Sequence, residues 1–512
     1  MKKSSLDRFC DHPKFSSQRL GTLPSRTLSG RRRALFLTVG FMAQGLLTVY
    51  GQVLQSAQPI VQRDLAWMHA NGFPEAESGV AVYKLRYWTP DLTGATSIAS
   101  AAYVIPLENC SLPLTCFIHG TQYVKTDAPS SWEDNSGAVD DGYTLGGDGF
   151  ACVLPDLLGL GDSPGRHPYL NAAADARTCI DAVRAAREFQ LQQTDSLNGQ
   201  LFLIGVSAGA HTCLATNEMM QEQYPDEFKV TAAGAVSGPY AIYPTIKDIM
   251  TLNQPFITGA DLVYILLGYQ AAYPGLFSST SDFLISPYDS ILPPYYDGMH
   301  TGGQIGQHIP SVPSTMIPLA LKEDLTHHPD DALNLRFKEN NVYEWAPQNP
   351  MRLCYCGGDI TVPPFNSILA HDSLVASGGT SVGLFELSTT ADHGQCGGLA
   401  RPFLNNWFRT FTTDCLGSSN IGTMLIQPNP AIWGKSVISL HLGGSQQGSG
   451  TVQLMDELGR TVMEQPFSFL DGTINVSIDL GPGRFPGIYF VQLIVGSDRY
   501  TGKLVVPRIG RT

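Results

Sequence analysis

The stretch that most constrains this 512-residue chain is Leu201–Gly209, which reads LFLIGVSAG. An apolar run ends there in Gly205-Val206-Ser207-Ala208-Gly209, and Ala210–Glu222 has the character of a helix. A strand, a sharp turn with a serine at its tip and a helix make up a nucleophile elbow. The residues beside the serine must be small because strand and helix pass close together, and glycine stands on both sides. The stretch therefore predicts Ser207 as a nucleophile.

Apolar runs alternate with helical patterns on both sides of this motif, which predicts an α/β fold with a mainly parallel sheet. The strand-like runs are Val80–Trp88 and Ser97–Pro106, which read as antiparallel edge strands, followed by Leu114–Ile118, Phe150–Leu154, Val230–Val236, Met351–Cys356 and Val382–Leu387. The helical segments are Asp175–Gln192, Asn366–Ser377 and Gly398–Phe411. From about Tyr240 to Pro350 the pattern breaks into an apolar segment rich in tyrosine and proline, which we interpret as an inserted, partly helical cap.

A serine hydroxyl needs a base to remove its proton and an acid to orient that base. Sheets of this kind carry the three residues in the order serine, acid, histidine. Asp359 is the candidate acid because it follows the run Met351–Cys356 and a Gly357-Gly358 turn. His393 is the candidate base because it comes directly after the last predicted strand. We therefore predict Ser207, Asp359 and His393 as a catalytic triad.

The other titratable residues are placed less favourably for these roles. They precede the serine, adjoin His393 directly or lie on other elements: Asp156, Asp162, Asp392, His211, His327 and His328. The oxyanion of the reaction needs two preset N–H donors. Ala208, directly after the serine, and Thr121, in the loop His119-Gly120-Thr121, are the predicted donors, with Gln122 as the next choice. We expect His119 to close that loop by a side-chain hydrogen bond.

Composition limits the classes of partner. The formal net charge of −13 argues against nucleic acid, whose phosphates require a basic surface. No cysteine pair has the spacing of a zinc site, since Cys354-Tyr355-Cys356 is too tight. The triad chemistry requires no metal and no cofactor, and the oligomeric state stays open.

The N-terminus has the pattern of a secretory signal peptide. Arg31-Arg32-Arg33 precedes a short apolar run that ends in small residues near Gly51, although a retained membrane anchor is the alternative. Export permits disulfides, but the nine cysteines left after loss of Cys10 cannot all pair. Cys116, Cys152, Cys354 and Cys356 lie in or beside apolar runs and are expected as core residues. Pairs Cys110–Cys116 and Cys396–Cys415 are both open as disulfides.

After a polar linker, Gly417–Thr423, the pattern becomes all-β. Short strand-like runs with intervening turns predict a small β-sandwich. The runs are Ser436–Leu442, Thr451–Met455, Thr473–Leu480, Ile488–Val495 and Tyr500–Val506. The predicted domains are therefore an N-terminal extension with signal peptide (1–51), a catalytic domain (52–416) with a cap at about 240–350, and a C-terminal sandwich (424–512).

Two resemblances extend this interpretation. His119-Gly120-Thr121, the run Pro155–Leu170, a helix with Asp181 and the elbow together resemble the secretory lipase branch of the α/β-hydrolases over about Val80–Cys415. That resemblance implies an α/β-hydrolase fold and hydrolysis of carboxylic esters, including lipids, by Ser207 with Asp359 and His393. The alternatives are a peptidase on the same core and a surface-binding protein with an inactive site.

The C-terminal segment is similar to a type A sorting domain of the type IX secretion system. The matching elements occur in order: Gln427–Pro430, Leu454–Arg460, Ile478–Leu480, Pro486–Val491 and a last strand with Lys503. The tail Pro507–Thr512 departs from that pattern. The resemblance implies recognition by the type IX secretion machinery and a secreted or cell-surface protein. An appended β-domain that binds a surface or a sugar is the alternative.

Overall fold

The computed structural model describes most of the chain from residue 52 onward. The described residues are 52–107, 111–132, 137–193, 196–412, 424–432, 435–442, 447–456, 460–469, 473–480, 487–496 and 498–506. The predicted signal peptide, Cys10, Cys110, Cys415 and the tail Pro507–Thr512 lie outside them. Within the described part, no helix has the length and apolar character needed to cross a membrane.

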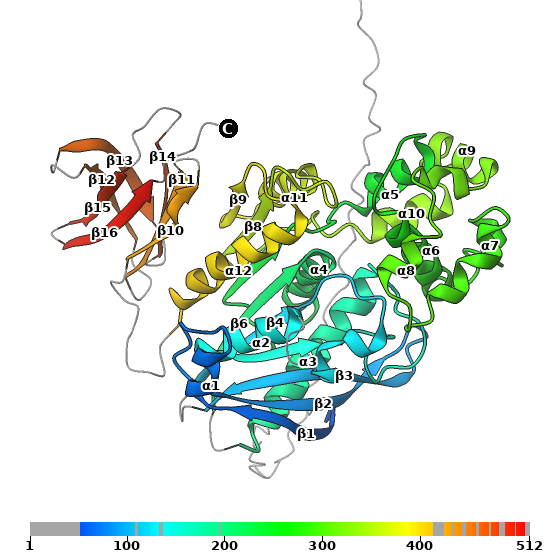
Figure 1. Cartoon of the computed structure of the whole chain (residues 1–512), viewed down its shortest axis with the longest axis horizontal. Coiled ribbons are helices and arrows are strands. Elements are labelled where there is room, and N and C mark those ends of the chain that lie inside the picture. Colours follow the sequence, from blue (N-terminus) through cyan, green and yellow to red (C-terminus); the bar gives the residue numbers. More distant parts are fainter. Residues whose placement is uncertain are drawn as a thin grey trace, which may run out of the picture. The chain divides into compact units, whose positions relative to one another are not determined.

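A nine-stranded mixed sheet forms the centre of the fold and confirms the predicted α/β class (Figure 1). Its order is β1-β2-β3-β5-β4-β6-β7-β8-β9, antiparallel from β1 to β5 and parallel from β5 to β9. The strands are β1 Leu54–Arg63, β2 Val80–Pro90, β3 Thr96–Pro106, β4 Leu112–Ile118, β5 Ala151–Pro155, β6 Leu197–Val206, β7 Ala232–Val236, β8 Met351–Cys356 and β9 Val382–Ser388.

Helices cover both faces of this sheet, as a buried parallel sheet requires. Helices α3, α4 and α11 share one apolar core with the sheet, and α1, α2 and α12 share the other. Their bounds are α1 Leu65–Ala70, α2 Gly137–Gly147, α3 Ala172–Gln190, α4 Ala208–Gln223, α11 Phe365–Ala376 and α12 His393–Arg409. In the parallel half every residue of β4, β5 and β7 is buried, which explains their continuous apolar runs.

The edge of the sheet differs from the prediction. Val80–Trp88 and Ser97–Pro106 were predicted as antiparallel edge strands, and both pair antiparallel, but β2 lies between β1 and β3, and β3 lies between β2 and β5. β1 is the edge strand. β1 has little apolar alternation because most of its residues are partly or fully exposed. It also contains Pro59, a residue that sheets tolerate chiefly at their edges. A half-exposed strand of this kind leaves no periodic signal in the sequence.

The helices between β7 and β8 form a cap, drawn in green in Figure 1. Their bounds are α5 Ile242–Thr251, α6 Gly259–Ala272, α7 Tyr288–Ile291, α8 Gly302–Gly306, α9 Leu319–His327 and α10 Ala332–Glu339. α6 is buried from Leu262 to Tyr269, as expected of a helix that is apolar on all sides. The other cap helices pack around it and give this segment a core of its own.

The C-terminal strands form two sheets over a shared apolar core, which agrees with the predicted sandwich. One sheet has the order β10-β11-β14 and the other β13-β12-β15-β16. The strands are β10 Met424–Ile432, β11 Lys435–His441, β12 Gly448–Met455, β13 Thr461–Phe469, β14 Thr473–Asp479, β15 Gly487–Val495 and β16 Asp498–Val506. β10 and β13 escaped prediction because both lie at sheet edges and carry prolines.

The close approach of β6, α4 and β4 explains the glycines of the elbow. A Cβ atom on Gly205 would stand 2.0 Å from the carbonyl oxygen of Gly209. A Cβ atom on Gly209 would stand 2.1 Å from the carbonyl oxygen of Ile118. Both neighbours are backbone atoms, so relief would require movement of the sheet or of α4. The motif is therefore a packing requirement as well as a chemical one.

We expect Gly205→Ala to destabilise the protein by at least the ~1–3 kcal/mol typical of an overpacked core. The matched control is Gly398→Ala in α12, where an added Cβ meets no atom within 4 Å. Thermal unfolding followed by circular dichroism should show a lower Tm for the first variant and an unchanged or higher Tm for the second. Equal melting temperatures for Gly205→Ala and the wild type would contradict the packing argument.

Candidate active site

Ser207 occupies the turn between β6 and α4 in a strained backbone conformation. Its φ and ψ are 57° and −125°, a region that residues with a Cβ rarely adopt. The Ser207 N–H donates to the carbonyl oxygen of Val236 at the end of β7, at 2.8 Å. The Oγ atom caps no helix amide. The fold therefore holds the backbone of Ser207 and leaves its hydroxyl available.

The structure brings the three predicted residues into one hydrogen-bonded row. His393 Nε2 lies 2.8 Å from Ser207 Oγ, and His393 Nδ1 lies 2.7 Å from Asp359 Oδ2. Each residue follows a strand of the parallel half: Ser207 after β6, Asp359 after β8 and His393 after β9. Strands of a parallel sheet end at the same edge, so these connections meet there.

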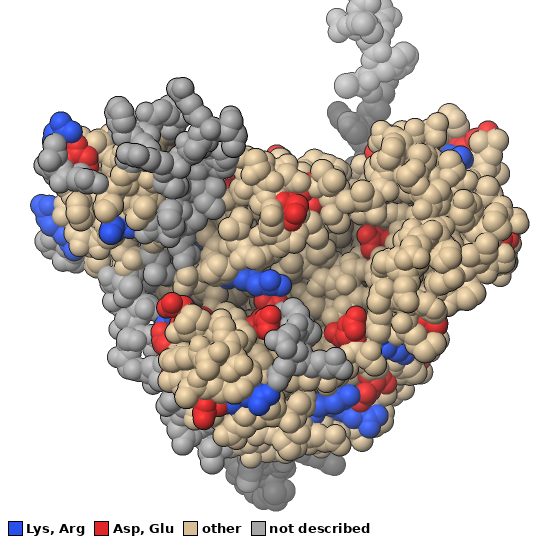
Figure 2. Space-filling model, in the orientation of Figure 1, with Lys and Arg blue, Asp and Glu red and all other residues tan. Residues whose placement is uncertain are grey.

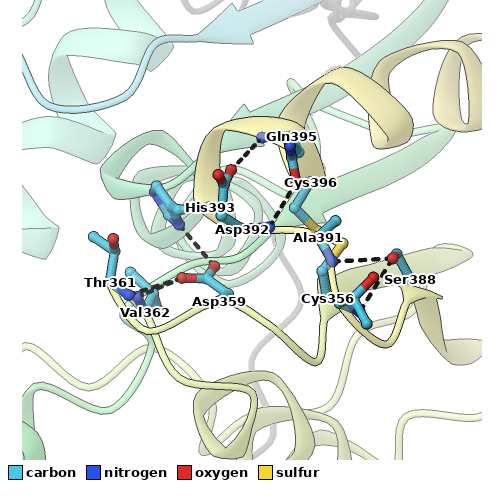
Figure 3. Close-up of a disulfide and its surroundings, with 11 residues drawn as sticks. Cys356, Asp359, Thr361, Val362, Ser388, Ala391, Asp392, His393, Gln395 and Cys396 are labelled. Carbon is cyan, nitrogen blue, oxygen red and sulfur yellow. Dashed lines mark hydrogen bonds and ion pairs between the residues drawn. A yellow bond between two sulfur atoms is a disulfide. The ribbon is translucent and has the colours of Figure 1, made fainter. Parts of the chain in front are cut away.

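Asp359 is fixed by its own loop. The backbone N–H groups of Thr361 and Val362 donate to Asp359 Oδ1, at 3.0 and 2.9 Å (Figure 3). Burial by itself would raise the pKa of this carboxyl, which is 2% exposed. The bonds from His393 and from the backbone outweigh burial, and they lower the pKa below its ordinary value. Asp359 is therefore an oriented, ionised partner for the imidazole.

His393 is the first residue of α12, and not a loop residue before a helix that begins at Gly398 as predicted. Asp392 caps this helix by accepting from Gln395 N–H, while the Gln395 side chain accepts from Asp392 N–H (Figure 3). The glycine-rich first turn concealed the true start of the helix from the sequence pattern. Asp392 is thus engaged as a cap and does not orient His393.

The remaining candidates have structural surroundings. Buried Asp156 accepts from Ser100 Oγ and Ser130 N–H, and Asp162 pairs with Lys84. His327 and His328 are exposed, as expected. Among the buried histidines, His119 Nδ1 lies 2.7 Å from Gly120 O, and His211 Nε2 lies 2.8 Å from Asn340 O at the end of the cap. Burial lowers the pKa of both imidazoles, that of His211 to about 4.

The proposed oxyanion donors flank the serine on two elements. Ala208 is the first residue of α4, where helix N–H groups lack intrahelical acceptors. The loop with Thr121 passes close by, since a Cβ on Gly120 would stand 3.5 Å from Ser207 Cβ. The Thr121 hydroxyl is within 2.5 Å of the Tyr169 hydroxyl, which ties the loop to the segment before α3. The roles of the Thr121 and Ala208 amides stay predictions.

Ser207 and His393 open into a cavity of about 640 Å³ between the core and the cap. Figure 2 shows this face of the molecule hollowed, with few charged atoms in the walls of the hollow. Apolar cap residues make up much of the lining: Ile246, Ile249, Phe256, Ile257, Ile265 and Ile309. Arg401 on α12 pairs with Asp141 at 2.5 Å within the lining.

Asp261 is a cavity residue that the sequence interpretation missed. It lies in the first turn of α6 and accepts a hydrogen bond from Tyr123 OH at 2.5 Å. Tyr123 follows the loop of Thr121, so this bond joins the cap to the core beside the serine. Burial raises the pKa of Asp261, although Tyr123 and His393 oppose the rise. The sequence feature that could have revealed Asp261 is its position as a single acidic residue at the start of the apolar run Asp261–Tyr269.

The disulfide in the structure is neither of the two pairs that the sequence left open. Cys356 bonds to Cys396, with a Cα–Cα distance of 5.7 Å (Figure 3). Cys396 is therefore unavailable to Cys415, and Cys116 is free and buried. Cys356 was expected as an unpaired core residue, but the end of β8 faces the first turn of α12, which sequence spacing does not reveal. In the described part of the chain, no group of three or more His, Cys, Asp or Glu residues could hold a metal ion.

Comparisons with known proteins place this geometry in context. Residues 117–372 match the model of the alpha/beta hydrolase family. No curated protein matches the sequence. The rice cell wall degrading esterase LipA from Xanthomonas oryzae is 25% identical, with a TM-score of 0.62 over 69% of this chain and 95% of that one.

Two structures of lower sequence identity show a likeness in fold alone. A Legionella pneumophila protein named as a hydrolase is 23% identical, with a TM-score of 0.66 over 71% of this chain and 99% of that one. Candida antarctica lipase A is 17% identical, with a TM-score of 0.55 over 72% of this chain and 84% of that one.

We expect Asp359→Asn to lower kcat for a p-nitrophenyl ester by about 10⁴-fold, because an amide favours the wrong imidazole tautomer. The matched control is Asp392→Asn, which should keep activity because asparagine is also a good helix cap. Circular dichroism checks that both variants fold. Equal losses in the two variants would show that Asp359 has no special role.

Proposed function

The chain belongs to the alpha/beta hydrolase family, and we propose that it is a serine hydrolase that cleaves carboxylic esters through an acyl-enzyme intermediate. The observation that carries the proposal is the row of hydrogen bonds from Ser207 through His393 to Asp359. The likeness to an esterase at 25% identity supports the ester as substrate.

In this mechanism Ser207 Oγ attacks the ester carbonyl while its proton passes to His393 Nε2. Asp359, bonded to Nδ1, holds the ring in the required tautomer and stabilises the imidazolium that forms. The amides of Ala208 and Thr121 are the proposed donors to the oxyanion. His393 then gives the proton to the leaving alcohol. Water, activated by the same imidazole, releases the acid and restores Ser207.

The cavity supports an apolar group on the substrate. Isoleucines of the cap line the same cavity as Ser207 and His393. Each methylene of an acyl chain that leaves water for such a wall gains about 0.8 kcal/mol. We therefore propose esters with an apolar acyl chain, lipids among them, as the substrate class.

A fluorophosphonate probe tests the nucleophile directly. Wild-type protein should be labelled and should hydrolyse p-nitrophenyl esters, whereas Ser207→Ala should do neither. A panel of esters of increasing chain length beside aminoacyl amides tests the substrate class, with kcat/KM expected to rise over the first few carbons and to be far lower for the amides. Faster turnover of the amides would favour a peptidase, and an unlabelled wild type would indicate a binding protein.

We also propose that the protein is exported and reaches the cell surface through the type IX secretion machinery. The support comes from the N-terminal pattern of charge and apolar residues, and from the ordered C-terminal motifs on a sandwich. The Cys356–Cys396 disulfide adds to it, because disulfides persist mainly in oxidising compartments.

A reporter fusion tests this route. An inert reporter placed between residues 1–51 and 424–512 should appear at the surface or in the medium of a bacterium that has this machinery. The same reporter with residues 1–51 alone should stay in the periplasm. Surface delivery that does not depend on residues 424–512 would refute the sorting role.

A further inference from the structure

The Cys356–Cys396 disulfide joins the two segments that carry the acid and the base. Cys356 is the last residue of β8 and stands three positions before Asp359. Cys396 lies in the first turn of α12 and stands three positions after His393. Along the chain Asp359 and His393 are 34 residues apart, with α11 and β9 between them. The sulfur bridge replaces that long path by a short covalent one (Figure 3).

The first turn of α12 has little else to hold it. Gly394, Gly397 and Gly398 contribute no side chains, while Asp392 and Gln395 are exposed and bond to each other. Cys396 is the buried side chain of this turn, at 0% exposure. The apolar residues that pack α12 against the core come later, from partly buried Leu399 to Phe408. Glycine also adds backbone freedom, so this turn is a weak helix by itself.

Pro402 lies near the start of the packed part of the helix and weakens its connection to the first turn. A proline inside a helix has no N–H to donate to the residue four positions earlier, which here is Gly398. The helical ladder between the first turn and the packed part of α12 therefore lacks one hydrogen bond, at the carbonyl oxygen of Gly398. The first turn that carries His393 is thus joined to the packed part less firmly than in an uninterrupted helix.

The contacts from the end of the sheet stop just before the first turn of α12. The β8–β9 ladder loses its regular register between Tyr355 and Cys356, where Cys356 faces Ser388. Beyond it, Gly357 N–H donates to Ser388 O at 2.7 Å, and a Cβ on Gly358 would stand 2.3 Å from Thr390 O. These contacts keep the acid loop against the end of β9. Buried Ala391 also donates its N–H to Ser388 Oγ at 3.0 Å, so the chain is held as far as the residue before Asp392. Within the first turn of α12 that follows, the buried side chain is that of Cys396.

We propose that the Cys356–Cys396 disulfide is a positioning element of the active site, which fixes the first turn of α12 to the end of β8 and so holds His393 within bonding distance of Asp359 and Ser207. The inference rests on the proposed function. A displacement of about 1 Å in such a site can cost about 10²-fold in rate. The oxidised protein is then the competent enzyme, and the dithiol form keeps the fold of the sheet with a misplaced base.

The test compares Cys356→Ser/Cys396→Ser with the wild type and with Cys354→Ser. Cys354 is the matched control because it is a buried, free cysteine two positions earlier on the same strand. All three proteins are assayed with a p-nitrophenyl ester well below their melting temperatures. We expect kcat of the double variant to fall by about 10- to 100-fold with KM within about twofold, and fluorophosphonate labelling to slow in parallel. Cys354→Ser should lose Tm without this loss of kcat.

A second measurement covers a double variant that does not fold. Wild-type chain purified with all thiols reduced is oxidised by oxidised glutathione, which is itself reduced to two thiols as the protein disulfide forms. The kcat of the protein should rise as the number of titratable thiols per protein chain falls. A kcat of the reduced chain or of the double variant within twofold of the oxidised wild type would overturn the positioning role. An oxidised wild type without Ser207-dependent turnover would overturn the proposed function instead, and this inference with it.

Discussion

The imidazole of His393 is the contact on which the site depends, because it meets Ser207 with one nitrogen and Asp359 with the other. The three residues of this row follow strands β6, β8 and β9, whose ends are set by the register of one sheet. The apolar core therefore fixes the positions of the strand ends. Two layers of helices bury the sheet, and buried strands cannot slip without exposing apolar residues. Strain in the backbone of Ser207 persists because the surrounding packing enforces it.

The cap contributes the second part of the site, which is the apolar lining of the cavity beside Ser207 and His393. The cap is inserted between β7 and β8, so it lies over the edge of the sheet at which Ser207, Asp359 and His393 meet. It has a core of its own and contributes an apolar wall to the cavity. Tyr123, which bonds to Asp261, links that wall to the loop beside the serine. A change in the cap can thus affect the loop beside Ser207 through the Tyr123–Asp261 hydrogen bond, without altering the sheet.

Sequence reasoning reached the parts of this architecture that leave a local or periodic signal. The elbow has fixed spacing, the buried strands are apolar runs, and the order of Ser207, Asp359 and His393 follows from their positions after strands. The rest lacks such a signal. Edge strands β1 and β13 are half-exposed and contain proline, and α12 begins in a turn rich in glycine. The pairing of Cys356 with Cys396 and the place of Asp261 depend on contacts between distant elements, which spacing along one chain does not encode.

The separation of 186 residues between Ser207 and His393 has a consequence for synthesis. A ribosome delivers the serine, the elbow helix and then the whole cap before it delivers the acid and the base. At about 5–20 residues per second, roughly 10–40 s pass between the emergence of Ser207 and that of His393. Throughout that interval the nascent chain carries a serine that has no base to take its proton. The order of the polypeptide thereby makes the row of Ser207, His393 and Asp359 one of the last features that translation completes before the C-terminal sandwich.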